Sequence, residues 1–91
     1  MAPEKITENM VSELFELLAT VDNAEDIAIL FDDLCTKNEI EQMTQRLQAA
    51  KLLLQGKTYN QVIEATDISS ATLSRVSNAV KYGKGYKQFV K

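Results

Sequence analysis

Apolar side chains recur at helical spacing along most of this chain, and no segment of useful length alternates apolar and polar residues as a strand would. The pattern predicts a first helix over about residues 5–20, a second that begins after Asp22 or Asn23, and the longest over about residues 37–55. The apolar stripe of the first helix is too broad for one neighbouring helix to cover. We therefore expect an all-α fold in which this helix has more than one neighbour.

The stretch from Thr58 to Val80 is the most informative part of the chain, because it predicts two short helices joined by a tight turn. Gly56 is placed to end the preceding helix, and Thr58 followed by Gln61 has the form of a capping box that begins a new one. Asp67 tolerates turn conformations, and Ser69 or Ser70 can cap the second helix. This order of elements is a helix-turn-helix.

The second helix of this motif has two unlike faces. Leu73, Val76 and Val80 recur at spacings of three and four and predict a buried stripe. The opposite stripe is small and uncharged until its end, and consists of Ser70, Ala71, Ser74, Ser77, Asn78 and Lys81. Such a helix can enter a major groove, because no bulky or acidic side chain would meet the phosphates. Gly83 is expected to end it, before a short final helix that folds back.

The charge of the chain changes sign near its middle. Residues 1–45 carry 11 acidic and two basic side chains, a net charge of −9, whereas residues 46–91 carry two acidic and eight basic ones, a net charge of +6. The whole-chain value of −3 hides this asymmetry. Because the basic half contains the helix-turn-helix, the charge favours phosphate contacts over a merely solvated surface.

Several classes of protein do not fit the composition. The 91 residues are enough for one domain, and no apolar run approaches the ~20 residues of a membrane span. The N-terminus lacks an apolar export signal and Cys35 is the single cysteine, so we expect a cytoplasmic protein. Without histidine, the usual metal clusters and histidine-based nucleophile triads are absent. The sequence predicts neither an enzyme nor a bound cofactor.

The stretch from Leu34 to Asn78 resembles the trp repressor family through the pieces LCTKNEIE, QRLQAAKLLLQG and ATLSRVSN. The tail KYGKGYKQF is similar to the YerC/YecD subgroup of trp-repressor-like proteins. The resemblance implies an all-α homodimer with intertwined N-terminal helices, and the broad apolar stripes of so short a chain make the same demand. We then expect one domain over residues 1–91, with dimerisation helices in 1–55, the helix-turn-helix in 57–81 and a basic C-terminal segment in 82–91.

The resemblance also implies an effector pocket, of which this chain retains part. Thr36, Arg46 and Arg75 stand where the family surrounds its bound amino acid, with the two arginines on either side of the indole ring. Val76 replaces the glycine that leaves room for the indole, and Ala79 replaces a serine that receives the ligand's ammonium group. A β-branched side chain in that gap blocks a flat bicyclic ligand. The pocket therefore predicts that tryptophan is not the corepressor.

The expected DNA contacts lie on both helices of the motif and on the lysines around it. They are Lys57, Asn60, Gln61, Ser70, Ala71, Thr72, Ser74, Arg75, Lys81, Lys84 and Lys87. Asn and Gln can bond adenine bidentately, hydroxyls reach phosphate or water, and methyl groups meet the thymine methyl. Glu64 stands where the family carries a lysine, so one phosphate contact is lost and the lysines nearby compensate.

These patterns together predict a cytoplasmic, dimeric transcriptional regulator that binds double-stranded DNA in a sequence-specific way and represses by occluding a promoter. No association with a membrane is expected. The alternative is a helical protein-interaction or effector-sensing module that kept the helix-turn-helix scaffold while its acidic half serves a protein partner. The identity of a small-molecule effector is open, as is whether Arg46 and Arg75 pair instead with acids such as Glu39 or Glu64.

Overall fold

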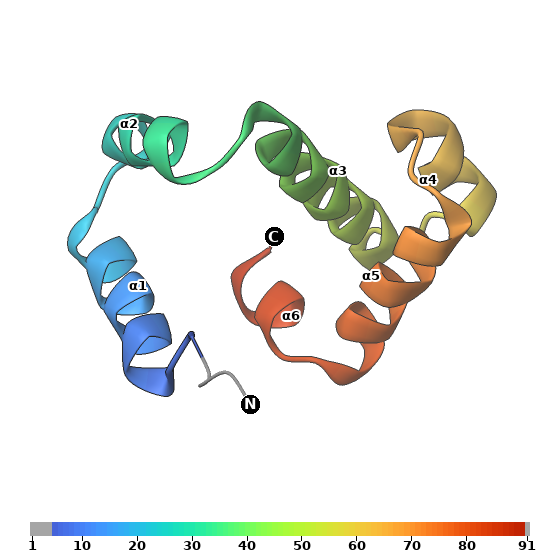
Figure 1. Ribbon diagram of the computed structural model, residues 1–91. Helices are drawn as coiled ribbons and strands as arrows, with labels where there is room; N and C mark the ends of the chain where they lie inside the picture. The colour runs from blue at the N-terminus through green and yellow to red at the C-terminus, as the bar shows by residue number, and fades with distance from the viewer. Residues whose placement is uncertain (1–4, 91) are drawn as a thin grey trace. The chain divides into compact units, whose positions relative to one another are not determined.

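The computed structural model describes residues 5–90, which fold into six helices and contain no strand (Figure 1). The helices are α1 (Glu8–Thr20), α2 (Ala24–Leu34), α3 (Lys37–Leu54), α4 (Tyr59–Thr66), α5 (Ser70–Tyr82) and α6 (Gly85–Phe89). The all-α prediction is confirmed. The chain divides into two compact units between Thr36 and Lys37, with α1 and α2 in the first and α3 to α6 in the second.

Local capping sets where the first two helices begin. The Thr7 hydroxyl accepts a hydrogen bond of 3.2 Å from the Met10 N–H, so α1 begins at Glu8, later than the apolar pattern predicted. The Asn23 side chain accepts the Asp26 N–H at 2.8 Å, which makes Asn23, and not Asp22, the cap of α2. Each cap satisfies one of the backbone donors that a helix leaves unpaired at its start.

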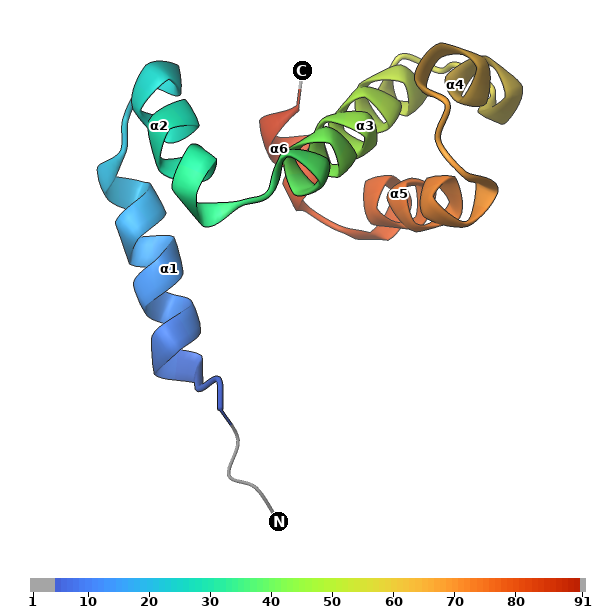
Figure 2. The ribbon, with the colours of Figure 1, turned by 45° about the horizontal axis from the view of Figure 1, so that its top comes forward.

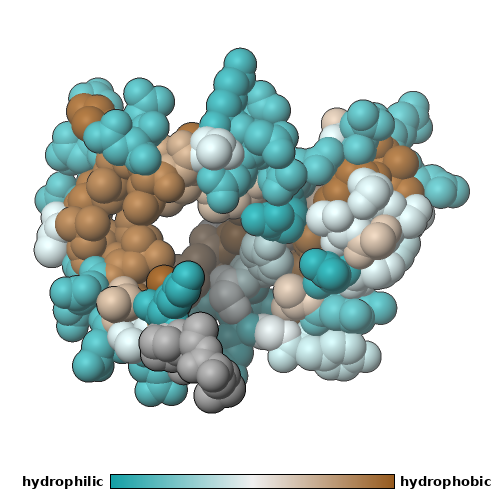
Figure 3. Space-filling view, in the orientation of Figure 1, coloured by the Kyte–Doolittle hydropathy of each residue, from teal (hydrophilic) through white to brown (hydrophobic). Residues whose placement is uncertain are grey.

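The first unit leaves most of its large apolar side chains exposed, and neither α1 nor α2 contains a buried residue. Phe15 is 63% exposed and Ile29 is 69% exposed. The other large apolar residues exposed in the described part of this unit are Ile6, Met10, Val11, Leu14, Leu17, Ile27 and Leu34. Figure 3 shows these hydrophobic side chains gathered over α1 and α2. Apolar surface of this extent is typical of a region that packs against a partner.

The second unit has a small core where α3 packs against α4 and α5, as Figures 1 and 2 both show. The buried core residues are Ala49, Ala50, Val62, Ile68, Leu73 and Val76. Because Ala49 and Ala50 carry only a Cβ, the backbone of α3 can approach α5 closely. The predicted buried stripe of α5 is confirmed, with Val80 packed at the edge of the core.

Gly56 ends α3 as predicted, in the left-handed conformation with a φ of 87°. The Lys57 N–H bonds to the Leu52 carbonyl and the Gly56 N–H to the Leu53 carbonyl, each at 3.0 Å. This pair of bonds is the Schellman motif, which satisfies the last carbonyls of a helix. A side chain at Gly56 would meet no atom within 4 Å, so the conformation, and not a lack of space, requires the glycine.

Gly83 ends α5 for a different reason. A Cβ at this position would lie 2.7 Å from the Ala79 carbonyl oxygen, which is too close for any other residue. The chain then turns into α6, and Tyr86 packs against the core of the second unit while Phe89 stays exposed. The predicted short final helix that folds back is confirmed.

Candidate nucleic-acid interface

The first helix of the motif, α4, begins with the predicted capping box. The Thr58 hydroxyl accepts the Gln61 N–H at 3.2 Å, and the Gln61 side-chain oxygen accepts the Thr58 N–H at 2.9 Å. The helix ends at Thr66, whose hydroxyl donates to the Val62 carbonyl at 2.7 Å. The start of this short helix is therefore fixed by side chains, and its end by the Asp67 N–H, which bonds to the Ile63 carbonyl at 2.8 Å.

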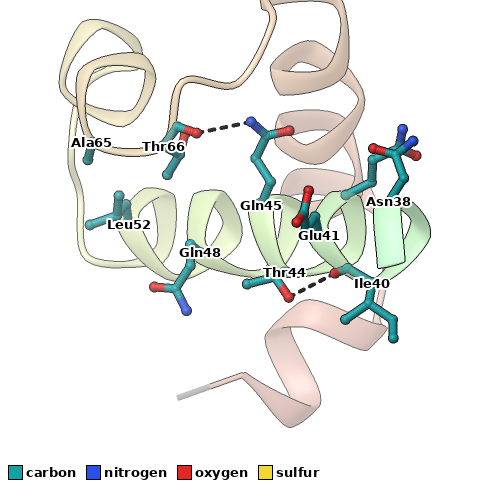
Figure 4. A pocket seen from close by; sticks show the side chains of 10 residues that line it. Asn38, Ile40, Glu41, Thr44, Gln45, Gln48, Leu52, Ala65 and Thr66 are labelled. Carbon is teal, nitrogen blue, oxygen red and sulfur yellow. Dashed lines mark hydrogen bonds between the residues drawn. The ribbon is translucent and has the colours of Figure 1, made fainter. Parts of the chain in front are cut away.

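The turn between α4 and α5 is fixed by one strained residue, one buried residue and one long-range hydrogen bond. Asp67 is left-handed, with a φ of 58°, and Ile68 is only 2% exposed in the angle between the helices. The Gln45 amide extends from α3 and donates to the Thr66 carbonyl at 3.0 Å, as Figure 4 shows. This bond connects residues 21 apart in sequence. The turn is thus held to α3, which sets the direction of α5.

Ser69 caps α5, and its hydroxyl accepts the Thr72 N–H at 3.2 Å and donates to the Thr72 hydroxyl at 2.9 Å. Of the two serines proposed as the cap, the first is therefore correct. Thr72 is half-buried and its hydroxyl takes part in the cap, so it is less available to DNA than its neighbours.

The rest of the predicted face of α5 is exposed, with one correction. Ser70, Ala71, Ser74 and Arg75 all face solvent. The assignment of Ser77 to this outward stripe was wrong, because Ser77 is 3% exposed and belongs to the buried side. It lies four residues after Leu73 and so shares the buried face of α5 with it. The stripe is otherwise as expected, and α5 contains no acidic residue.

The lysines around the motif do not all have the same surroundings. Lys57, Lys81 and Lys84 are exposed. Lys87 is also exposed, but its ammonium group donates to the Lys81 carbonyl at 2.8 Å. That carbonyl belongs to the last turn of α5, where backbone acceptors lack helical partners and a cation is favoured. Lys87 therefore ties α6 to the end of α5, a role that its sequence position did not indicate.

On α4, Asn60, Gln61 and Glu64 are all exposed. Glu64 and the helix-ending Asp67 are the two acids of the motif, against the basic side chains around it. The side chains predicted for DNA contact therefore lie on two helices, α4 and α5, joined by a turn that Gln45 holds to α3. Figure 4 shows the hydrogen bond from Gln45 to the turn.

The residues predicted for the effector pocket differ in their exposure, and the pocket stays a prediction. Val76 is 2% exposed and packs in the core beside α3. Arg46 and Ala79 are half-buried and Arg75 is exposed. Within residues 5–90, no ion pair joins either arginine to Glu64. Thr36 ends the first unit, and its part in such a pocket stays a prediction.

A hollow of about 810 Å³ lies along α3, beside the end of α4 (Figure 4). Its lining is rich in side-chain amides and comprises Asn38, Ile40, Glu41, Gln42, Thr44, Gln45, Gln48, Leu52, Ala65 and Thr66. None of the predicted effector residues contributes to it. The sequence did not indicate this hollow, since its two walls are separated along the chain.

The six helices, and the capped and exposed α5 as the second helix of the motif, define an all-α helix-turn-helix protein. Over residues 8–91 the chain matches the model of the Trp repressor protein family, and it belongs to that family. It is 37% identical to the uncharacterized protein YerC of Bacillus subtilis (strain 168) over 83 residues. These residues make up 91% of this chain and 80% of YerC. The predicted resemblance is confirmed.

Two solved structures share the fold. A candidate Trp repressor from Staphylococcus aureus is 40% identical with a TM-score of 0.86, over 99% of this chain and 91% of that one. A TrpR-like protein from Eubacterium eligens is 35% identical with a TM-score of 0.82, over 90% of this chain and 84% of that one. The family is one of DNA-binding regulators and not of enzymes. None of the helices within residues 5–90 has both the length and the apolar composition needed to cross a membrane.

Proposed function

We propose that this protein is a sequence-specific transcriptional regulator that binds double-stranded DNA in the cytoplasm and represses by occluding a promoter. The observation that carries the proposal is the outward face of α5, which is small, polar, free of acids and exposed on a helix fixed at both ends. A helix of this form can enter the major groove and bring Ser70, Ala71 and Ser74 to the base edges.

A second copy of the chain is the partner that we propose for the first unit. Exposed apolar side chains occur on α3 as well as on α1 and α2, and those on α3 are Met43, Leu47 and Leu54. A dimer would bury this surface and present two copies of α5 to half-sites about 34 Å apart. Light scattering should give twice the chain mass of 10.2 kDa, and a well-folded monomer at micromolar concentration would contradict the dimer.

The effector of this regulator is not tryptophan. The buried Val76 stands where the family has a glycine that leaves room for an indole, and Ala79 offers no hydroxyl to an ammonium group. Both features support a regulator that responds to another ligand or to none.

An acidic substitution on the proposed recognition face tests the function. Ala71→Glu places a carboxylate in the first turn of α5, where the helix dipole favours it, so the fold is retained. Ala24→Glu makes the same change in the first turn of α2 and is the matched control. Fluorescence anisotropy with labelled duplex DNA should show binding by the wild type and by Ala24→Glu, and loss of binding by Ala71→Glu. Equal binding by both variants would contradict the proposed face.

A further inference from the structure

We propose that Gln45 is a positioning residue for DNA reading, whose hydrogen bond to the turn gives the motif its preference for one sequence without any contact between Gln45 and DNA. The proposal rests on the DNA-binding function above and names a residue outside the predicted contact face on which the specificity of that function depends. Sequence-specific and non-specific binding then depend on different parts of the second unit.

The bond from Gln45 satisfies a backbone acceptor in the last turn of α4. The carbonyls of that turn lack partners within the helix, and the carbonyl of Thr66, its last residue, is one of them. It accepts the Gln45 amide at 3.0 Å, as Figure 4 shows. Only the nitrogen of that amide can donate to a carbonyl, so the partner settles the orientation of the side chain. Both residues are half-buried, which makes the loss of this donor costly.

This bond acts on the segment that decides where α5 points. Asp67, which follows Thr66, has a φ of 58°, a conformation that such a residue keeps only where its surroundings hold it. Ile68 is buried in the core, but apolar burial has no directional preference. A hydrogen bond, in contrast, requires a particular distance and angle. Gln45 therefore restricts the directions that α5 can take relative to α3.

The two kinds of DNA contact differ in how far they depend on that direction. Base reading requires the side chains of α5 to be aligned with the base edges in the groove. Phosphate contacts tolerate more variation, because Lys57, Lys81 and Lys84 are exposed and have long, flexible side chains. A motif that can take other directions binds its preferred sequence only through the fraction of molecules in the reading geometry. Its specific affinity falls with that fraction, whereas its non-specific affinity does not.

The position of Gln45 on α3 separates this role from the proposed dimer. Successive residues of an α-helix are rotated by about 100°, so Gln45 lies about 200° around the helix from both Met43 and Leu47. Those two side chains belong to the exposed apolar surface that the proposed dimer buries. A substitution at Gln45 therefore leaves that surface unchanged.

The test compares variants that remove or restore the hydrogen-bond donor. Gln45→Met keeps the length of the side chain and removes the donor, whereas Gln45→Asn keeps an amide that is too short to reach Thr66. Gln45→Lys restores a donor of sufficient length. Gln48→Met is the matched control, because Gln48 is exposed on the same helix and lines the same hollow. Within residues 5–90 the Gln48 side chain makes no hydrogen bond that this change would remove.

Fluorescence anisotropy measures the affinity for a duplex selected by the wild type and for a random duplex, at a temperature where circular dichroism shows each variant to be folded. Gln45→Met and Gln45→Asn should bind the selected duplex about tenfold more weakly. Their affinity for the random duplex, and its salt dependence, should stay at the wild-type values. Gln45→Lys should restore the ratio of the two affinities, and Gln48→Met should bind both duplexes as the wild type does.

A second selection from a random pool separates positioning from direct contact. Loss of the Gln45 bond should weaken the preference at all positions of the site together, because α5 changes direction as a body. Relaxation of a single position would instead mean that Gln45 contacts one base, and would overturn the proposal.

The remaining outcomes separate this inference from the function on which it rests. An equal loss of affinity for both duplexes would mean that Gln45 only supports the fold, and would overturn its role while leaving the regulator in place. An unchanged ratio of affinities in Gln45→Met and Gln45→Asn would also overturn it. A wild type that enriches no sequence would overturn the proposed function, and the role of Gln45 would fall with it.

Discussion

Truncation of Val76 is the most direct test of the packing between α3 and α5. Val76→Ala removes two methyl groups from a side chain that is 2% exposed in the core of the second unit. At about 0.8 kcal/mol for each buried methyl or methylene group, the lost free energy of transfer from water is about 1.6 kcal/mol. The cavity that remains adds to this cost, so we expect the free energy of unfolding to fall by about 2–3 kcal/mol.

Urea unfolding at fixed protein concentration measures this change, since the stability of a dimer depends on concentration. Tyr82→Ala is a suitable control, because Tyr82 is 83% exposed and its truncation should change the stability by less than about 0.5 kcal/mol. A loss of less than about 0.5 kcal/mol for Val76→Ala would refute the reasoning. It would mean that Val76 does not fill the interface, and that the space for an indole is open after all.

Three further predictions concern ligands and charge. Isothermal titration with L-tryptophan should show no binding at millimolar concentration, and micromolar affinity would contradict the argument from Val76. Arg75→Ala and Lys81→Ala should both weaken DNA binding measured by fluorescence anisotropy. Lys81→Ala should weaken binding equally for all sequences and reduce the steepness of the salt dependence by about 1. Unchanged affinity in both variants would exclude this surface. Lys87→Met should lower the melting temperature by about 2–4 °C through loss of its bond to the Lys81 carbonyl, whereas Lys84→Met should lower DNA affinity alone. The reverse assignment would contradict the distinction between these two lysines.

The helix-turn-helix could be predicted from the sequence because its boundaries depend on local chemistry. Gly56 is required by a positive φ, Asp67 tolerates one, and Thr58 with Gln61 forms a box whose bonds span three residues. Each of these signals acts within a few positions along the chain, so the order of residues contains it. The same holds for the caps of α2 and α5. The sequence offered two neighbouring candidates for each cap, and the caps in the structure are Asn23 and Ser69.

What the sequence could not provide depends on contacts between distant segments or on the rotation of a helix. The Gln45 amide reaches the end of α4 across 21 residues, and nothing near either position indicates the bond. Ser77 is small and polar, so its residue type suggested the outer face, although its register places it inside. The double use of Gln61, as cap and as surface residue, likewise appears only when the direction of its amide is known.

The central claim is that α5 reads a specific DNA sequence in a dimeric protein. The most direct test is to select duplexes from a genomic pool and to measure anisotropy of the selected and of a random duplex across a salt series. The account predicts salt-steep binding, an affinity for the selected duplex at least ~10³-fold higher, and two half-sites about one helical turn apart. Equal affinity for both duplexes, or no binding at about 50 mM salt, would contradict it.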